Sequence, residues 1–170
     1  MRPARAAPNL ASPHRLLLMC LSIAIDRPDD VLAEGEHLGF QWVVVNNGMG
    51  YRCGYARVPL GHPWHGKKYR DLDDVAVHGG VTFTEADVPC DAPGADTDWW
   101  IGFDCAHAFD APDPELARSR SDSGPSLSLL NKLLVDGDSE RYEVRTQAYV
   151  ENECRSLCQQ AANAIELAKS

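Results

Sequence analysis

Apolar residues in the middle of the chain come in short runs separated by polar turns, and this pattern predicts antiparallel β-structure. The clearest segment is 40–58, FQWVVVNNGMGYRCGYARV, in which two runs rich in β-branched and aromatic residues flank a loop of asparagine and glycine. Such runs are typical of strands, and Asn and Gly supply the turn conformations that join them. The segment is therefore predicted to form a β-hairpin.

Two further segments show the same succession of apolar runs and turns. In 74–85, DVAVHGGVTFTE, a pair of short strands is expected, interrupted at Gly79 and Gly80, because glycine within a strand pattern marks a bulge or bend. The segment 97–107, TDWWIGFDCAH, is apolar enough to predict a central strand. At least four strands thus follow one another without a helix, and CLSIAI at 20–25 is interpreted as a short first strand or a buried apolar anchor.

The C-terminal region changes to a helical period. Apolar residues recur there at three- and four-residue spacing, which predicts one long amphipathic helix from about Thr146 to Ala168. Cys154 and Cys158, four residues apart, share its apolar face and are predicted to be core residues. The predicted fold class is α+β: a mainly antiparallel sheet covered by one long C-terminal helix.

The length of 170 residues suits a single domain with its own core. Residues 19–170 are predicted to form this domain, with a flexible insert at about 108–138 that is rich in Pro, Asp, Ser and Arg. Within the insert, 127–135 is interpreted as a short helix or strand. Residues 1–18 are interpreted as a disordered leader, or as an extension ahead of a true start at Met19. A signal peptide is the alternative, because basic residues precede the apolar run at 16–25.

Charge and cysteine content narrow the functional classes. The formal net charge is -9, and so acidic a surface repels phosphate backbones, so general nucleic-acid binding is not expected. The apolar run at 16–25 is too short to span a bilayer, so no membrane association is expected either. The six cysteines are irregularly spaced, which indicates a reduced cytoplasmic protein rather than a disulfide framework.

Candidate functional residues lie where the predicted strand 97–107 ends. Along a strand, Phe103, Cys105 and His107 share one side, and Asp104 points to the other. A structural interpretation has Asp104 capping a turn, Cys105 filling the core and His107 bonded to a neighbouring carbonyl. A functional interpretation adds polar and aromatic residues from the same sheet edge. The candidate ligand-binding cluster is then His62, Trp64, His78, Asp104, Cys105 and His107.

The same set contains ligands for a divalent metal ion. His62, His78 and His107 are the candidate ligands, with Asp104 beside them, and a cation held there would activate water. An alternative zinc site would use His62, His65, Cys105 and His107. These residues have suitable ligand types, although their spacing is not an established zinc motif. Nucleophilic catalysis is a further enzymatic option, with Cys105 as nucleophile and His78 or His107 as base.

Four segments together carry a family resemblance: GYRCGYARVPLGHPWHGKKYRDLD, VHGGVTF, WWIGFDCAHAFD and YEVRTQAYVENECRSLCQQ. In this order they cover most of residues 40–162, and they are similar to a family of small, mostly uncharacterised proteins of phages and bacterial genomes. The resemblance implies no established activity. The chain departs from the family pattern in the proline-rich insert at 86–96 and in the longer linker after Phe109. Both are expected to lie in loops. The positions that match the family's motifs are Gly61, His62, Pro63, His78, Gly79, Gly80, Trp100, Gly102, Phe103, Asp104 and His107.

Two hypotheses of function follow, from different classes. The first is an accessory protein of a phage or mobile element, a non-enzymatic module that binds a small molecule or a host protein through its aromatic and histidine-lined face. The second is a small metal-dependent hydrolase or nuclease-like enzyme. Convergence of three or more of the histidine and aspartate side chains within metal-ligand reach would favour the enzyme.

Overall fold

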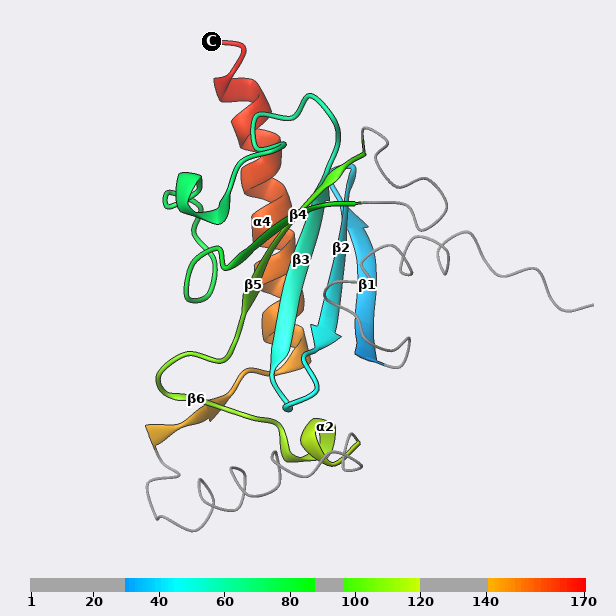
Figure 1. Ribbon diagram of the computed structural model, residues 1–170, viewed down its shortest axis with the longest axis vertical. Helices are drawn as coiled ribbons and strands as arrows, with labels where there is room; N and C mark the ends of the chain where they lie inside the picture. Colours follow the sequence, from blue (N-terminus) through cyan, green and yellow to red (C-terminus); the bar gives the residue numbers. More distant parts are fainter. Residues whose placement is uncertain (1–29, 88–96, 120–140) are drawn as a thin grey trace, which may run out of the picture.

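The computed structural model describes residues 30–87, 97–119 and 141–170. The strands of its main sheet are β1 (Val31–His37), β2 (Phe40–Asn46), β3 (Arg52–Val58), β4 (Phe83–Ala86) and β5 (Trp99–Asp104). Their spatial order is β1-β2-β3-β5-β4, and each neighbouring pair is antiparallel (Figure 1). A long helix, α4 (Gln147–Leu167), packs against β1, β2 and β3. The predicted α+β class is thereby confirmed.

The predicted hairpin at 40–58 is formed by β2 and β3. Side chains of the two asparagines between them organise the turn, because Asn46 Oδ1 accepts a hydrogen bond from the backbone N–H of Gly48 at 3.1 Å. Asn47 Oδ1 accepts one from Met49 at 2.9 Å and one from Tyr51 at 3.2 Å. Short amide side chains that bond their own backbone two residues on are the reason that Asn favours such turns.

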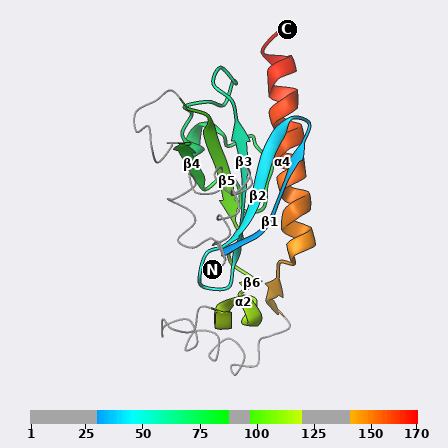
Figure 2. The ribbon, with the colours of Figure 1, turned by 90° about the vertical axis from the view of Figure 1, so that its right-hand side faces the viewer.

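Helix α4 lies along one face of the sheet, as the side view shows (Figure 2). Cys154 and Cys158 are fully buried on this face, which confirms their prediction as core residues. The helix approaches β3 closely at Gly54, where an added Cβ would lie 2.7 Å from the Cys154 sulfur. A fully buried aliphatic or aromatic side chain contributes about 1.5–3 kcal/mol to the stability of the fold relative to its exposed state. Apolar residues of the opposite face form a second cluster: Val43, Val45, Cys53, Tyr55 and Trp100.

The predicted helix and the observed one agree to within one residue at each end. Thr146 is the N-cap, and its side-chain oxygen accepts a hydrogen bond from the backbone N–H of Tyr149 at 3.2 Å. A hydroxyl at this position satisfies a backbone donor that the helix itself leaves unpaired. None of the helices in the described ranges is long and apolar enough to cross a membrane.

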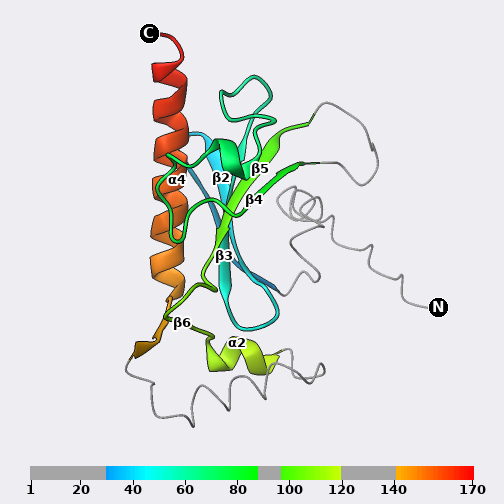
Figure 3. The same cartoon turned by 60° about the vertical axis from the view of Figure 1, so that its left-hand side comes forward.

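The predicted strand pair at 74–85 is wrong in its first half. Only β4 at its end is a strand, whereas Val75 and Val77 lie in the loop 59–82 that joins β3 to β4 and runs beside α4 (Figure 3). The Gln160 side chain replaces a strand partner here: its amide donates to the Ala76 carbonyl and accepts from the Ala76 N–H, both at 2.8 Å. Val75 joins the core under α4.

The chain contains one edge strand that the sequence pattern did not indicate, β1, whose residues VLAEGEH include two exposed glutamates. The predicted first strand or anchor at 20–25, the leader at 1–18 and the segment 127–135 all lie outside the described residues. The beginning of the predicted insert at 108–138 is ordered into a two-residue strand β6 (Asp110–Ala111) and a short helix α2 (Pro114–Ser119). Strand β6 pairs in parallel with β7 (Glu143–Val144), just before α4.

Candidate metal centre

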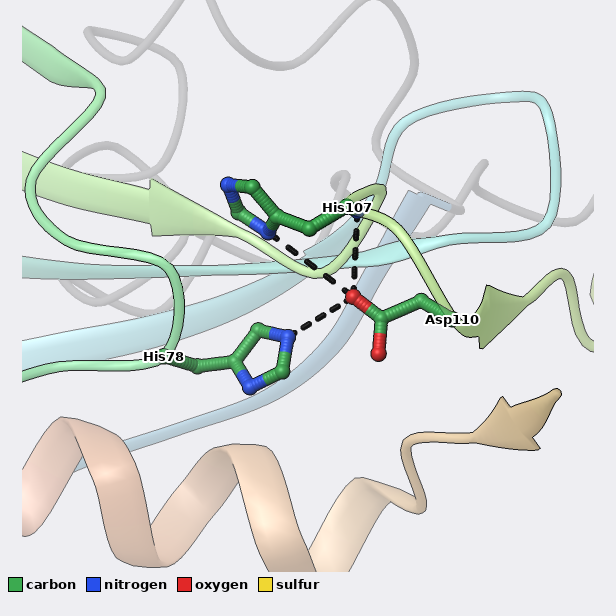
Figure 4. Close-up of side chains that lie close together, drawn as sticks. All are labelled: His78, His107 and Asp110. Carbon is green, nitrogen blue, oxygen red and sulfur yellow. Dashed lines mark hydrogen bonds and ion pairs between the residues drawn. The ribbon is translucent and has the colours of Figure 1, made fainter. Parts of the chain in front are cut away.

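Three side chains that can ligate a metal converge at the end of the sheet where β5 ends. They are His78, from the loop 59–82, His107, from the turn after β5, and Asp110, the first residue of β6 (Figure 4). His78 Nε2 lies 2.7 Å from Asp110 Oδ2, and His107 Nδ1 lies 3.7 Å from the same oxygen. One ligand atom from each residue falls within 4.8 Å of the other two.

The turn that follows β5 brings His107 and Asp110 together. Asp104 Oδ1 accepts a hydrogen bond from the Ala106 N–H at 3.0 Å, and the Asp110 N–H bonds the His107 carbonyl at 3.1 Å. The strand therefore ends at Asp104, and His107 does not lie on the same strand side as Cys105, contrary to prediction. Phe109 completes the turn with a φ of 73°, a left-handed conformation that is rare for a bulky side chain.

Two residues of helix α4 position His78. The His78 backbone N–H donates to Glu153 Oε2 at 2.8 Å, and His78 Nδ1 lies 3.2 Å from the Tyr149 hydroxyl. Glu153 and Tyr149 are four residues apart and so lie on one face of the helix. Since a tyrosine hydroxyl can donate or accept, it accommodates either tautomer of His78. Histidine ligands of metals are commonly oriented by such a partner on the second ring nitrogen.

Asp110 is the most buried member of the cluster, with a side chain only 1% exposed. Its Oδ1 accepts a hydrogen bond from Arg145 Nε at 2.8 Å, and its Oδ2 accepts the His107 backbone N–H at 3.0 Å. Burial alone would raise the pKa of the Asp110 carboxyl, but the hydrogen bonds from His78, Arg145 and His107 outweigh it and hold this pKa below the usual value of 3.8. Asp110 is therefore ionised at neutral pH.

The Nδ1 atom of His107 is shielded from solvent and has no hydrogen-bond partner. Its separations from Asp110 Oδ2, 3.7 Å, and from Asp104 Oδ1, 4.0 Å, exceed hydrogen-bonding distance. The ring packs against Gly79, where an added Cβ would overlap it. A buried polar atom without a partner costs about 1–3 kcal/mol, a cost that a bound water or ion would remove.

Two imidazole nitrogens and one carboxylate oxygen are a suitable donor set for a divalent transition metal such as Zn²⁺, Fe²⁺ or Co²⁺. Mg²⁺ and Ca²⁺ instead prefer oxygen ligands. For metal–ligand bonds of about 2.0–2.1 Å, the ligand atoms of a tetrahedral site lie about 3.3 Å apart. The two separations that involve Asp110 Oδ2, 2.7 and 3.7 Å, lie on either side of this value, and all three ligand atoms lie within 4.8 Å of one another.

His62, predicted to be the third metal ligand, does not belong to this cluster. Its Nε2 lies 3.0 Å from the Ala161 carbonyl, and its Nδ1 accepts the Trp64 N–H at 3.0 Å. Ala161 is eight to twelve residues along α4 from the residues that hold His78, which is about 12–18 Å at the helical rise. The predicted ligand set of His62, His78 and His107 is thus brought together only in part, with Asp110 in the place of His62.

Trp64 and Cys105, two further members of the predicted cluster, lie in the hydrophobic core. Cys105 is 1% exposed, and burial together with the nearby Asp110 carboxylate raises the pKa of its thiol to about 12. A thiol with so high a pKa remains protonated at neutral pH and is a poor nucleophile. The structure therefore contradicts the hypothesis of a nucleophilic Cys105. The alternative zinc set with Cys105 and His65 is not assembled either, because His65 Nε2 bonds the Thr97 carbonyl at 2.7 Å.

Asp104 lies beside the metal-ligand cluster, although its carboxylate is not one of the three convergent ligands. Its Oδ2 accepts a hydrogen bond from the Thr82 hydroxyl at 2.9 Å, while Oδ1 caps the turn and lies 4.0 Å from His107 Nδ1. The predicted turn-capping role is therefore confirmed. The structural interpretation is wrong for His107, whose Nδ1 faces carboxylates rather than a carbonyl.

Sequence reasoning missed Asp110 and the residues that surround it, Arg145, Tyr149 and Glu153. The signal for Asp110 was its place three residues after His107 in AHAFD, a spacing that meets across a turn. The signal for Tyr149 and Glu153 was their four-residue spacing on the predicted helix.

Comparisons of the chain with protein-family models, with curated proteins and with solved structures found no match.

Proposed function

We propose that this protein is a small metal-dependent hydrolase in which His78, His107 and Asp110 hold a divalent transition-metal ion. The observation that carries the proposal is the convergence of the three ligand residues. One of them, His107, has a shielded Nδ1 without a hydrogen-bond partner. A metal held by three protein ligands leaves a coordination position for water, and it lowers the pKa of that water enough to produce hydroxide near neutral pH.

The surrounding residues have distinct roles in this proposal. Arg145 holds the second oxygen of Asp110, which leaves Oδ2 facing His78 and His107, where it would ligate a metal (Figure 4). Tyr149 orients the His78 ring through its Nδ1. Asp104, whose side chain is about one third exposed and whose Oδ1 lies 4.0 Å from His107 Nδ1, would act as the general base when a metal held here activates water.

Metal binding by the full chain tests the site. After treatment with a chelator, titration calorimetry with Zn²⁺ and with Co²⁺ should show one equivalent bound. His78→Ala and His107→Ala should each weaken binding by about a hundredfold or more, because each removes one of three ligands. His65→Ala is the matched control, since it removes a histidine of the same loop outside the cluster. Absence of stoichiometric binding, or equal binding by all four proteins, would overturn the proposal.

Hydrolysis is tested separately with a neutral activated ester, 4-nitrophenyl acetate. The Zn²⁺-loaded protein should accelerate its hydrolysis, and Asp104→Asn should retain the metal while slowing the reaction by about a hundredfold, which is typical for loss of a general base. Metal binding without such activity would contradict the hydrolase.

A non-enzymatic binding module is the second candidate, and one observation favours it. The buried Trp64 contributes little to an aromatic surface, but Phe109 and Tyr142 form an exposed pair with ring centroids 6.4 Å apart. This pair flanks the β6–β7 strands that carry Asp110. A metal that binds without hydrolytic activity, in a protein whose partner binding is lost in Phe109→Ala, would make the module the better account.

A further inference from the structure

The charges around the metal centre decide which substrates it can take, and this inference rests on the proposed function. Three carboxylates contact the cluster or belong to it: Asp110 itself, Glu153 on the His78 backbone, and Asp104 beside His107. The guanidinium of Arg145 contacts Asp110 directly, and it also forms an ion pair with Glu143 at 2.6 Å.

The next residues outward do not change the balance. Arg52 donates to the Arg145 carbonyl at 2.9 Å, but its guanidinium also forms an ion pair with Asp113 at 2.6 Å. Tyr51, Thr82 and Tyr149 complete the surroundings and carry no charge at neutral pH. Within these described residues the site has five carboxylates and two guanidinium groups, which gives a local charge of -3 before a metal binds.

A divalent cation reduces this local charge to -1 without reversing it. Enzymes that cleave phosphate esters surround the phosphoryl group with Arg, Lys or additional metal ions, which neutralise its negative charge. Both arginines here are instead neutralised by carboxylates of this chain. The full chain, with these residues included, has a net charge of -9, which repels anions over a distance of about one Debye length.

We infer that the metal centre acts on neutral or cationic carbonyl compounds, such as esters or amides, and not on phosphate esters or nucleic acids. This inference separates the two members of the hydrolase or nuclease-like class. It also assigns Asp104 a second effect besides its role as proton acceptor, because its partly exposed carboxylate lies 4.0 Å from His107 Nδ1 and would repel an incoming anion.

The test compares two small ligands of different charge on the Co²⁺-loaded full chain. The visible absorption of bound Co²⁺ reports when imidazole, a neutral ligand, or inorganic phosphate enters the open coordination position. Imidazole affinity should be the same at low and at physiological ionic strength, whereas phosphate should bind weakly and its affinity should increase as salt screens the repulsion. Asp104→Asn should strengthen phosphate binding by about three- to tenfold and leave imidazole binding unchanged.

Each result has a defined meaning. Phosphate binding that is tight, that weakens with added salt, and that is unaffected by Asp104→Asn would overturn the inference while leaving the metal site intact. Failure of Co²⁺ to bind at all would instead overturn the proposed function, which the inference requires. Glu143→Gln is the matched control for charge removal farther from the metal, because its side chain is 70% exposed and contacts only Arg145 among the residues described for the site. It should have a smaller effect than Asp104→Asn.

Discussion

Two histidines of the same loop, His62 and His78, both dock on helix α4 and yet have opposite surroundings. His62 is 5% exposed and contacts the rings of Phe40 and Trp64, and its hydrogen-bond partners are two uncharged backbone groups. Burial lowers the pKa of His62, an effect that the Ala161 carbonyl only partly offsets. His78 instead faces an ionised carboxylate and a tyrosine hydroxyl. The neighbours of a histidine, rather than its position in a motif, thus distinguish a core residue such as His62 from a candidate ligand such as His78.

The largest expected effect is the loss of stability in His62→Ala, about 2–4 kcal/mol, because it leaves a cavity and removes two buried hydrogen bonds. His78→Ala should cost only about 1 kcal/mol in the metal-free protein, since Asp110 keeps its hydrogen bonds from Arg145 and from the His107 N–H. Urea unfolding in the presence of a chelator measures both. The distinction fails if the two variants are equally destabilised, or if His62→Ala, once folded, has lost metal binding.

Gly79→Ala should lower the free energy of unfolding by about 2–3 kcal/mol. Gly79 has a φ of 67°, and an added Cβ would overlap the His107 ring, so both backbone strain and displacement of the ring contribute. Gly80→Ala is the matched control: its φ is 87°, but the space around its Cβ is open, so only the backbone cost of about 1 kcal/mol remains. Gly79→Ala should also weaken Zn²⁺ binding, and Gly80→Ala should not. Identical behaviour of the two variants would show that the ring contact has no influence on the site.

The smallest effect concerns pH. A carboxyl whose pKa in the folded protein lies below its unfolded value stabilises the fold at neutral pH, and this contribution disappears as the pH falls through the folded-state pKa. Asp110 is such a group, with its pKa held below 3.8. Asp110→Asn should therefore destabilise the metal-free protein by about 1–2 kcal/mol at pH 7. Thermal unfolding at pH 7 and at pH 3 should show this difference shrinking in acid, and a constant difference would contradict the assignment.

The fold could be predicted because its elements depend on local patterns. The hairpin at 40–58 and the helix after Thr146 are specified by apolar periodicity and by turn and cap residues, and both are observed. The first half of 74–85 could not be predicted, because Val75 and Ala76 are positioned by contacts with α4 that lie far away in the sequence.

The candidate site could be predicted only in part for the same reason. His78 and His107 were identified from their residue type and their place beside glycines and a strand end. Asp110 becomes a neighbour of His107 only because the chain reverses after Asp104, and it becomes a neighbour of His78 only because α4 holds the loop in place. The position of His62 depends on which end of the helix its loop segment meets, and no short motif contains that information.

Helix α4 is divided lengthwise between two tasks, and this division has a consequence for how the protein can evolve. Val150, Cys154 and Leu157 face the sheet and are fully buried, whereas Tyr149 and Glu153 project toward the loop that carries His78. Tyr149 also packs against the core, but Glu153 does not, so a substitution of Glu153 alters the charge beside His78 without removing an apolar contact. The surroundings of His78 can thus change through Glu153 alone, while the sheet and the buried face of the helix keep their packing.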